Sequence, residues 1–140
     1  MYMRLKIIIA VFTLMAIKVS AFSQNNSLNG TWVLDSVQII KHSDKSTVDV
    51  KQIKGNSFFA LYDTIMFKGN EMTIYENGYS ARGEITIFGK AISFSFVPAT
   101  INWEYNIKDG ILFLEQRVTI PSIGNLAEGT YIILTQYKKQ

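Results

Sequence analysis

The sequence predicts an all-β fold, an eight-stranded antiparallel up-and-down β-barrel formed by residues 24–140. Apolar residues alternate with polar residues at a period of two, which is typical of strands with one buried face. Short turns containing Gly, Asn or Asp separate these segments, and such residues favour tight hairpins between sequential antiparallel strands. Eight strands with one apolar face can close on themselves, which removes exposed edges and encloses a small interior.

Residues 1–23 are expected to be a cleaved signal peptide, because they run from the basic "MYMRLK" through an apolar stretch to the small residues of "VSAFS". The apolar stretch, "IIIAVFTLMAI", has 11 residues, whereas a membrane-spanning helix needs roughly 20. We expect cleavage after Ala21 or Ser23, no stable membrane span afterwards, and a secreted or periplasmic protein. The chain has no Cys for a lipoprotein anchor or a disulfide.

The expected strands, in chain order, are 31–41, 63–68, 71–77, 79–88, 91–97, 101–108, 111–118 and 130–138. Alternation is clearest from 79 to 108, where the inward residues are Tyr79, Ala81, Gly83, Ile85, Ile87, Ile92, Phe94, Phe96, Ile101, Trp103, Tyr105 and Ile107. Asp35 interrupts the first strand and predicts a bend rather than an acid catalyst. Glu115 shares a predicted face with Ile111 and Phe113, where we expect exposure at an edge or barrel end. The segment 48–62 is ambiguous between a short helix and a loop.

The charge of the domain excludes some partners. Arg4, Lys6 and Lys18 account for the whole formal excess of +3, so the Lys and Arg that remain after cleavage equal the 11 Asp and Glu in number. Nucleic-acid binding requires a concentrated positive face that neutralises phosphates. We therefore expect no nucleic-acid partner.

Gly30-Thr31-Trp32, followed by an eight-strand meander, resembles the lipocalins and the wider calycin group, particularly the short lipocalin-like domains of secreted bacterial proteins. The resemblance implies that Gly30 and Trp32 form the barrel floor, with Trp32 packed beneath the interior. It also implies a late basic residue over that Trp, for which Arg117 and Lys138 are candidates. Lys108-Asp109-Gly110 stands where the family commonly has Thr-Asp-Tyr.

Alternating strand directions place the connections 42–62, 77–78, 97–100 and 119–129 at one end of the barrel and 69–70, 88–90 and 109–110 at the other. Both long connections thus lie opposite Trp32 and predict an open mouth, because long loops on a rigid scaffold often carry function. Aromatic residues of the first long connection are expected to fold over the interior as a lid. Equally, both loops could simply cover the barrel top.

Two functions remain open at this stage. The first is binding of a small apolar ligand in the interior, and the expected ligand-binding residues are Phe58, Phe59, Tyr62, Tyr79, Phe94, Phe96, Trp103 and Tyr105. Of the two tryptophans, only Trp103 is expected to lie just inside the mouth, where it could sense a ligand. The second is a filled barrel that serves as a protein-interaction or inhibitor module at the cell envelope. An eight-stranded barrel permits either, because its interior is just wide enough for side chains or one small ligand.

An enzyme is not expected. The single His, His42, lies in the polar stretch "KHSDKS", and its neighbours Ser43 and Asp44 do not make a triad by adjacency, since a triad needs groups that converge in space. One His and no Cys exclude a zinc site built from those residues. We expect no metal and no cofactor.

Overall fold

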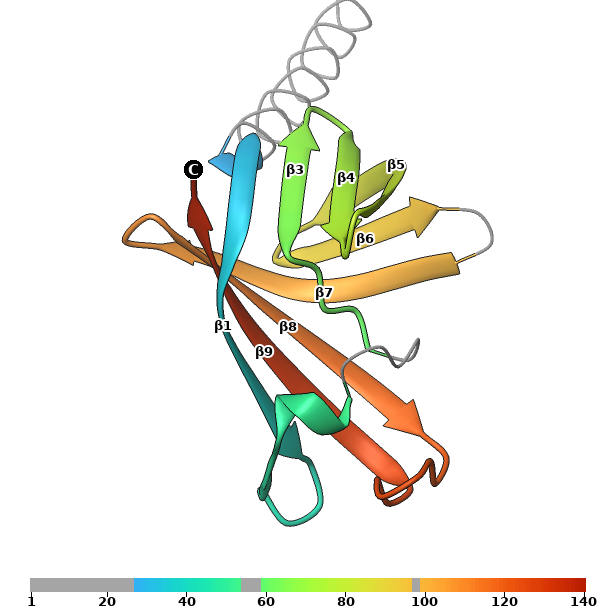
Figure 1. The fold of residues 1–140 in the computed structure, drawn as a ribbon. Coiled ribbons are helices and arrows are strands. Elements are labelled where there is room, and N and C mark those ends of the chain that lie inside the picture. Colours follow the sequence, from blue (N-terminus) through green and yellow to red (C-terminus); the bar gives the residue numbers. More distant parts are fainter. Residues whose placement is uncertain (1–26, 54–58, 97–98) are drawn as a thin grey trace, which may run out of the picture.

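The computed structural model describes residues 27–53, 59–96 and 99–140 (Figure 1). The expected signal peptide, 1–23, lies outside the described residues. The described elements are β1 (Gly30–Lys41), β2 (Thr47–Val48), the 3-10 helix η1 (Val50–Gln52), β3 (Thr64–Lys68), β4 (Glu71–Glu76), β5 (Tyr79–Phe88), β6 (Ala91–Phe96), β7 (Ala99–Lys108), β8 (Ile111–Ile120) and β9 (Gly129–Lys139).

The strands form one sheet in the order β2-β1-β3-β4-β5-β6-β7-β8-β9, and β9 also pairs with β1. All of these pairings are antiparallel. The eight strands other than β2 therefore close into an antiparallel up-and-down barrel, which confirms the predicted fold class. Val48 of β2, which pairs with Ile39 near the far end of β1, and the single turn η1 lie in the segment 48–62, whose structure the sequence left ambiguous.

The hairpin turns explain why consecutive strands pair so tightly. Asn77 and Gly78 have φ angles of 48° and 81°, and Asp109 and Gly110 have 54° and 74°. Two consecutive residues with positive φ form the turn type whose twist matches that of the flanking strands. Asn and Asp tolerate this left-handed region better than most residues, so the two-residue connections close β4 onto β5 and β7 onto β8.

A bulge in β1 keeps apolar residues inside the barrel on both sides of Asp35. The pairing of β1 with β9 shifts between Leu34 and Ser36, so inward positions run Trp32, Leu34 before the bulge and Val37, Ile39 after it. Oδ1 of Asp35 lies 3.1 Å from Nζ of Lys138 on the surface. The predicted bend at Asp35 is confirmed.

The structure shows which face of β8 is buried. Leu112 and Leu114 are 0% and 3% exposed and belong to the core, whereas Glu115 lies on the opposite face, in contact with Nε of Arg117 at 3.4 Å. Apolar residues occupy both faces at 111–114, so alternation alone did not identify the buried one. Gln116 lies on the same face as Leu112 and Leu114 and is half-buried.

The floor half of the barrel is filled by side chains. Its core cluster consists of Leu28, Trp32, Tyr62, Ile65, Phe67, Met72, Ile74, Ile85, Ile92, Phe94, Trp103, Leu112, Leu114 and Tyr137. Leu28 precedes β1 and is fully buried, so the chain closes the floor before the first strand begins. Gly30 has a φ of 127°, and a Cβ there would lie 2.7 Å from Cε of Lys139, which accounts for Gly at this position.

A second core lies at the opposite end, where β1, β8 and β9 extend beyond the shorter strands and η1 lies across them (Figure 1). Its buried members are Ile39, Ile53, Phe59, Ile120, Leu126, Tyr131 and Ile133. Ile53 and Phe59 come from the connection between β1 and β3, and they are 1% and 6% exposed. This connection is thus part of a hydrophobic core and not only a cover over the interior.

Candidate functional site

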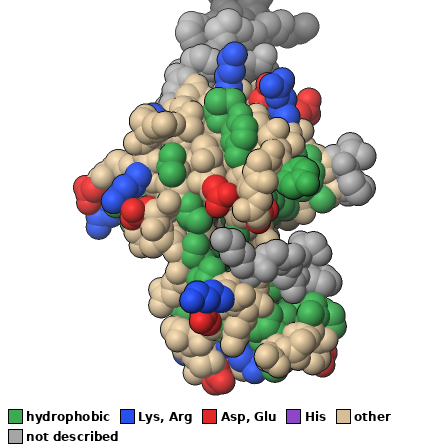
Figure 2. Space-filling view, in the orientation of Figure 1, with side chains coloured by type: hydrophobic (Ala, Val, Ile, Leu, Met, Phe, Trp, Pro, Cys, Tyr) green, Lys and Arg blue, Asp and Glu red, His purple; other side chains and the backbone are tan. Residues whose placement is uncertain are grey.

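A cavity of about 690 Å³ opens at the end of the barrel opposite Trp32, between the two cores. We call it the mouth cavity. It is lined by Phe59, Ala60, Tyr62, Ile74, Glu76, Asn77, Tyr79, Ser80, Ala81, Phe96, Ala99, Thr100, Ile101 and Gln116. Figure 2 shows the molecule narrowing below the part formed by β3–β7, with hydrophobic side chains visible in the constriction.

The walls of the mouth cavity come from strand ends that tight pairing holds in place. The β4–β5 hairpin supplies one side, where Ile74 pairs with Ala81. The facing ends of β6 and β7 supply another, where Phe96 pairs with Ala99. Ile74 is paired on both sides, whereas Ala81, Phe96 and Ala99 are each paired on one side, because the pairing of β5 with β6 begins at Glu84 and that of β7 with β8 at Glu104. The cavity lies where these strand ends separate.

Phe59 and Tyr62 close the cavity on the side of the β1–β3 connection. The ring of Phe59 packs edge-on against Tyr131, with centroids 6.2 Å apart. Tyr62 packs edge-on against Trp103 at 6.3 Å, and its carbonyl accepts a hydrogen bond of 2.9 Å from the hydroxyl of the buried Tyr137. Both aromatic residues are therefore packed into the cores while they line the cavity.

A smaller cavity of about 100 Å³ adjoins the first, and Phe59, Glu76 and Asn77 line both. Leu34, Val37 and Ile53 line its other side. The backbone N–H of Asn77 donates to Oδ2 of Asp63 at 3.3 Å. Phe59 thus lies between two hollows.

Several polar side chains line the mouth cavity beside the apolar ones, among them Glu76, Asn77, Ser80, Thr100 and Gln116. Oε1 of Gln116 is buried and has no hydrogen-bond partner among the described residues. Burial, together with the nearby negative charge of Glu76, raises the pKa of the Tyr62 hydroxyl above its ordinary value, so that hydroxyl stays neutral. The lining is therefore mixed, with apolar side chains beside hydroxyl, amide and carboxyl groups.

The residues predicted to bind a ligand divide between cavity and core. Phe59, Tyr62, Tyr79 and Phe96 line the mouth cavity, and Tyr79 lies at its rim with 81% of its surface exposed. Phe58 lies outside the described residues.

Phe94, Trp103 and Tyr105 do not line the mouth cavity. Phe94 and Trp103 stack in the filled core with ring centroids 6.3 Å apart, and Tyr105 packs against the same core. Trp103 therefore lies deeper than the position just inside the mouth that the sequence suggested. Its ring packs edge-on against Tyr62, which lines the cavity.

Gln116, Ile74 and Ala60 line the cavity but were absent from the predicted set. Gln116 was missed because apolar residues occupy both faces of β8 at 111–114, so alternation did not show which face is buried. Ile74 lies opposite Ala81 in the ladder and could have been found from its pairing. Ala81 and Ile101 were predicted to face inward but were not singled out as site residues.

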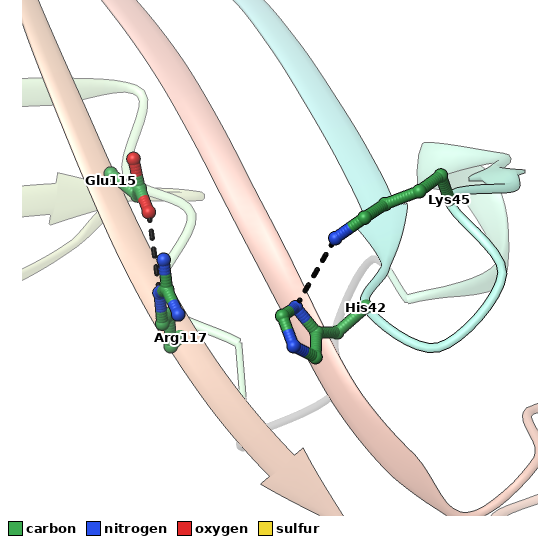
Figure 3. Close-up of polar contacts among 4 residues, drawn as sticks. All are labelled: His42, Lys45, Glu115 and Arg117. Carbon is green, nitrogen blue, oxygen red and sulfur yellow. Dashed lines mark hydrogen bonds and ion pairs between the residues drawn. The ribbon is translucent and has the colours of Figure 1, made fainter.

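Asp35, Glu115 and the stretch His42-Ser43-Asp44, which were considered for catalysis, do not line the mouth cavity. His42 lies in the exposed turn after β1, with its Nδ1 3.5 Å from Nζ of Lys45, and Glu115 with Arg117 forms a separate pair on β8 (Figure 3). Oδ1 of Asp44 accepts hydrogen bonds from the N–H and hydroxyl of Ser46, so its role is to hold the turn. Among the described residues, no group of three or more His, Cys, Asp or Glu could hold a metal ion.

Comparison with known proteins gives little further information. The sequence matches no protein family and no curated protein. Among solved structures, the barrel is similar to the zebrafish ileal bile acid-binding protein in complex with cholic acid, with 19% identity, a TM-score of 0.39, and coverage of 80% of this chain and 98% of that one. Within the described part of the chain, no helix is long and apolar enough to cross a membrane.

Proposed function

We propose that this protein is an exported lipocalin-like binding protein that holds a small, largely apolar ligand in the mouth cavity. One observation carries the proposal: a filled floor supports a formed cavity of about 690 Å³ at the open end. That volume falls within the roughly 300–1,000 Å³ of typical small-molecule sites. The protein acts by binding and not by catalysis, and it needs no cofactor.

The arrangement of the two cores supports this function. Core clusters lie on both sides of the cavity, and each contributes a buried aromatic side chain to its wall, Tyr62 from one and Phe59 from the other. Preformed walls lower the conformational entropy that binding must overcome. A ligand would enter a hollow that is already shaped.

The alternative, a protein-interaction or inhibitor module at the cell envelope, requires an interior without room for a ligand. The floor half of the barrel is filled in this way, but the mouth half contains the cavity. The cavity therefore favours the ligand-binding proposal, and the alternative becomes the conclusion if no ligand binds.

The test is a titration with neutral naphthalene, monitored by tryptophan fluorescence. Ala81→Phe places a bulky ring inside the cavity and should abolish binding, whereas Ala91→Phe, on the exposed start of β6, should leave it unchanged. Both variants must retain the circular dichroism spectrum of the parent protein. Equal binding by the two variants would place the ligand elsewhere, and no binding by the parent to this or a broader apolar panel would favour the interaction module.

Export is a second part of the proposal and rests on the N-terminal sequence alone. We propose cleavage after Ser23, which makes Gln24 the first residue of the mature chain. N-terminal sequencing of the protein recovered from the periplasm or medium tests it. A start at Phe22 would support the alternative site after Ala21, and a protein that retains Met1 inside the cell would contradict export.

A further inference from the structure

A second hollow lies on the outer face of the barrel. It has a volume of about 410 Å³ and is lined by residues of four neighbouring strands, β7, β8, β9 and β1, together with Lys90 from the turn between β5 and β6. We call it the outer hollow. It shares no lining residue with the mouth cavity. Its volume also falls within the roughly 300–1,000 Å³ of small-molecule sites.

The register of the sheet brings two rows of outward side chains to this hollow, and each row takes one residue from each of the four strands. The first row consists of Asn106, Phe113, Gln136 and Ser36, and the second of Glu104, Glu115, Leu134 and Gln38. Residues paired across neighbouring strands point to the same face. Leu114 and Thr135, which lie between the rows, are 3% and 5% exposed and point inward, so both rows face outward.

The middle of the outer hollow is apolar. Phe113 and Leu134 lie diagonally across the β8–β9 ladder, a separation that an aromatic side chain can bridge. Both are half-buried, so part of each side chain remains accessible. The uncharged polar residues of the two rows surround them, and all of these are exposed or half-buried: Asn106, Gln136, Ser36 and Gln38. The hollow thus combines an apolar floor with accessible hydrogen-bonding groups.

The charges around the outer hollow balance. Lys90 and Glu104 carry opposite charges, and Oε1 of Glu115 lies 3.4 Å from Nε of Arg117, just beyond the hollow (Figure 3). No excess of either sign attracts an ion, and an ion that entered would give up part of its hydration. A hydroxyl group suits this lining better, because it can donate to a carboxylate or amide oxygen and accept from an amide or ammonium N–H.

We infer that the outer hollow binds a neutral sugar ring. The C–H face of such a ring lies against Phe113 and Leu134, where it removes apolar surface from water. Its hydroxyl groups meet the side-chain amides of Asn106 and Gln136, which line opposite sides of Phe113. This inference goes beyond the proposed function, since it concerns another face of the barrel and another class of ligand.

An NMR titration at neutral pH tests the inference. The neutral probes are the methyl β-glycosides of glucose, galactose and N-acetylglucosamine, and the charged probes are glucuronate and glucosamine. We expect at least one neutral glycoside to shift the side-chain amide signals of Asn106 and Gln136 and the methyl signals of Leu134. The methyl signals of Ile74 and Ala81, which line the mouth cavity, should not move. Both charged sugars should bind more weakly than that glycoside.

Two variants identify the responsible side chains, each with a matched control. Gln136→Met keeps an unbranched side chain but removes the amide, so the glycoside should bind about fivefold to tenfold more weakly, the range for one net hydrogen bond. Gln52→Met, at an exposed position of η1, should change nothing. Phe113→Ala removes the ring from the floor and should lose most of the affinity, whereas Phe88→Ala, at a side chain that is 86% exposed and outside the hollow, should keep it.

The remaining outcomes separate this inference from the proposed function. Ala81→Phe, which fills the mouth cavity, should bind the glycoside as the parent protein does, and loss of binding in that variant would place the sugar in the mouth. No response to any of the three glycosides would overturn the inference, as would binding that survives both Gln136→Met and Phe113→Ala. Tighter binding of glucuronate or glucosamine would refute a neutral ligand. None of these results depends on whether naphthalene binds in the mouth cavity.

Discussion

The indole N–H of Trp32 donates a hydrogen bond of 2.7 Å to the carbonyl oxygen of Leu28, four residues earlier in the chain. Both residues are buried, and Nζ of Lys139 lies 5.4 Å from the centroid of the Trp32 ring. The chain segment before β1 and the end of β9 thus meet at the same ring. The late basic residue over Trp32 is Lys139, whereas the candidates Arg117 and Lys138 contact Glu115 and Asp35.

Trp32→Ala should destabilise the protein severely. Truncating a buried Trp costs about 3–5 kcal/mol through lost packing and the cavity left behind. Trp32 is 1% exposed and its N–H has a buried partner, so little of this loss can be recovered. Urea unfolding measures the change, with Val33→Ala on the outer face of the same strand as the control. An unchanged midpoint for Trp32→Ala would contradict the role of this residue in closing the floor.

Gly83→Ala should also destabilise the barrel, although it adds only one methyl group. A Cβ at Gly83 would overlap the backbone carbonyl of Ser95 and lie 2.7 Å from Cε2 of Phe94, which is fully buried. The backbone of β6 cannot move without breaking its ladder, so we expect a loss of about 1–3 kcal/mol, the range for overpacked cores. Ser80→Ala, on the same strand, should change stability little. Thermal unfolding of both variants tests this prediction. Equal melting temperatures would show that the backbone of β6 shifts to make room for the added methyl group.

The sequence predicts the barrel well because its two main signals are local. Turn residues such as Asn77-Gly78 define where strands end, and alternation from 79 to 108 defines their inner face, so most strand boundaries agree within two residues. The position of the mouth cavity depends on contacts between residues that are far apart in the sequence. Tyr79 was expected to be buried because its strand alternates, but it lies at the rim beside a turn, where no neighbouring strand covers it.

The core role of Ile53 and Phe59 was likewise not predictable from the sequence. The segment around them has no clean period, and its residues are buried by the far halves of β8 and β9, more than 60 positions later in the chain. The expectation of a lid covered only part of their role. Local patterns therefore indicate strands and turns, while the packing of irregular segments depends on contacts that the local sequence does not encode.

The protein should lose stability in alkali above about pH 10, the ordinary pKa of tyrosine. Burial raises the pKa of Tyr137 and of Tyr62 in the folded state, so both hydroxyls remain neutral there while the unfolded chain ionises. The stabilisation is complete below the unfolded pKa and is lost as the pH rises from that value toward the folded pKa values. Urea unfolding across this range measures the loss. Tyr62→Phe should reduce the slope of the unfolding free energy against pH. An unchanged slope would contradict a raised pKa of Tyr62 in the folded protein.

Phe59→Ala should destabilise the second core and join the two cavities that Phe59 separates. The ring is 6% exposed and packs against Tyr131, so we expect a loss of about 3 kcal/mol, at the low end for buried aromatics because the site adjoins an open hollow. The enlarged hollow should admit a bulkier neutral probe than the parent protein accepts. Unfolding and binding measurements on the same variant test both effects. If the variant were as stable as the parent protein, Phe59 would cover the interior without contributing to the second core.

The most direct test of the mouth cavity as the ligand site is a methyl NMR titration of the protein with 2-naphthol. We predict shifts for Ile74, Ala81 and Ile101, which line the cavity, and for the side-chain amide of Gln116. The methyl groups of Leu112 and Ile92, buried in the filled core, should not move to a comparable extent. Shifts confined to the floor or to the outer face of the barrel, with Ile74, Ala81 and Ile101 unchanged, would contradict the account.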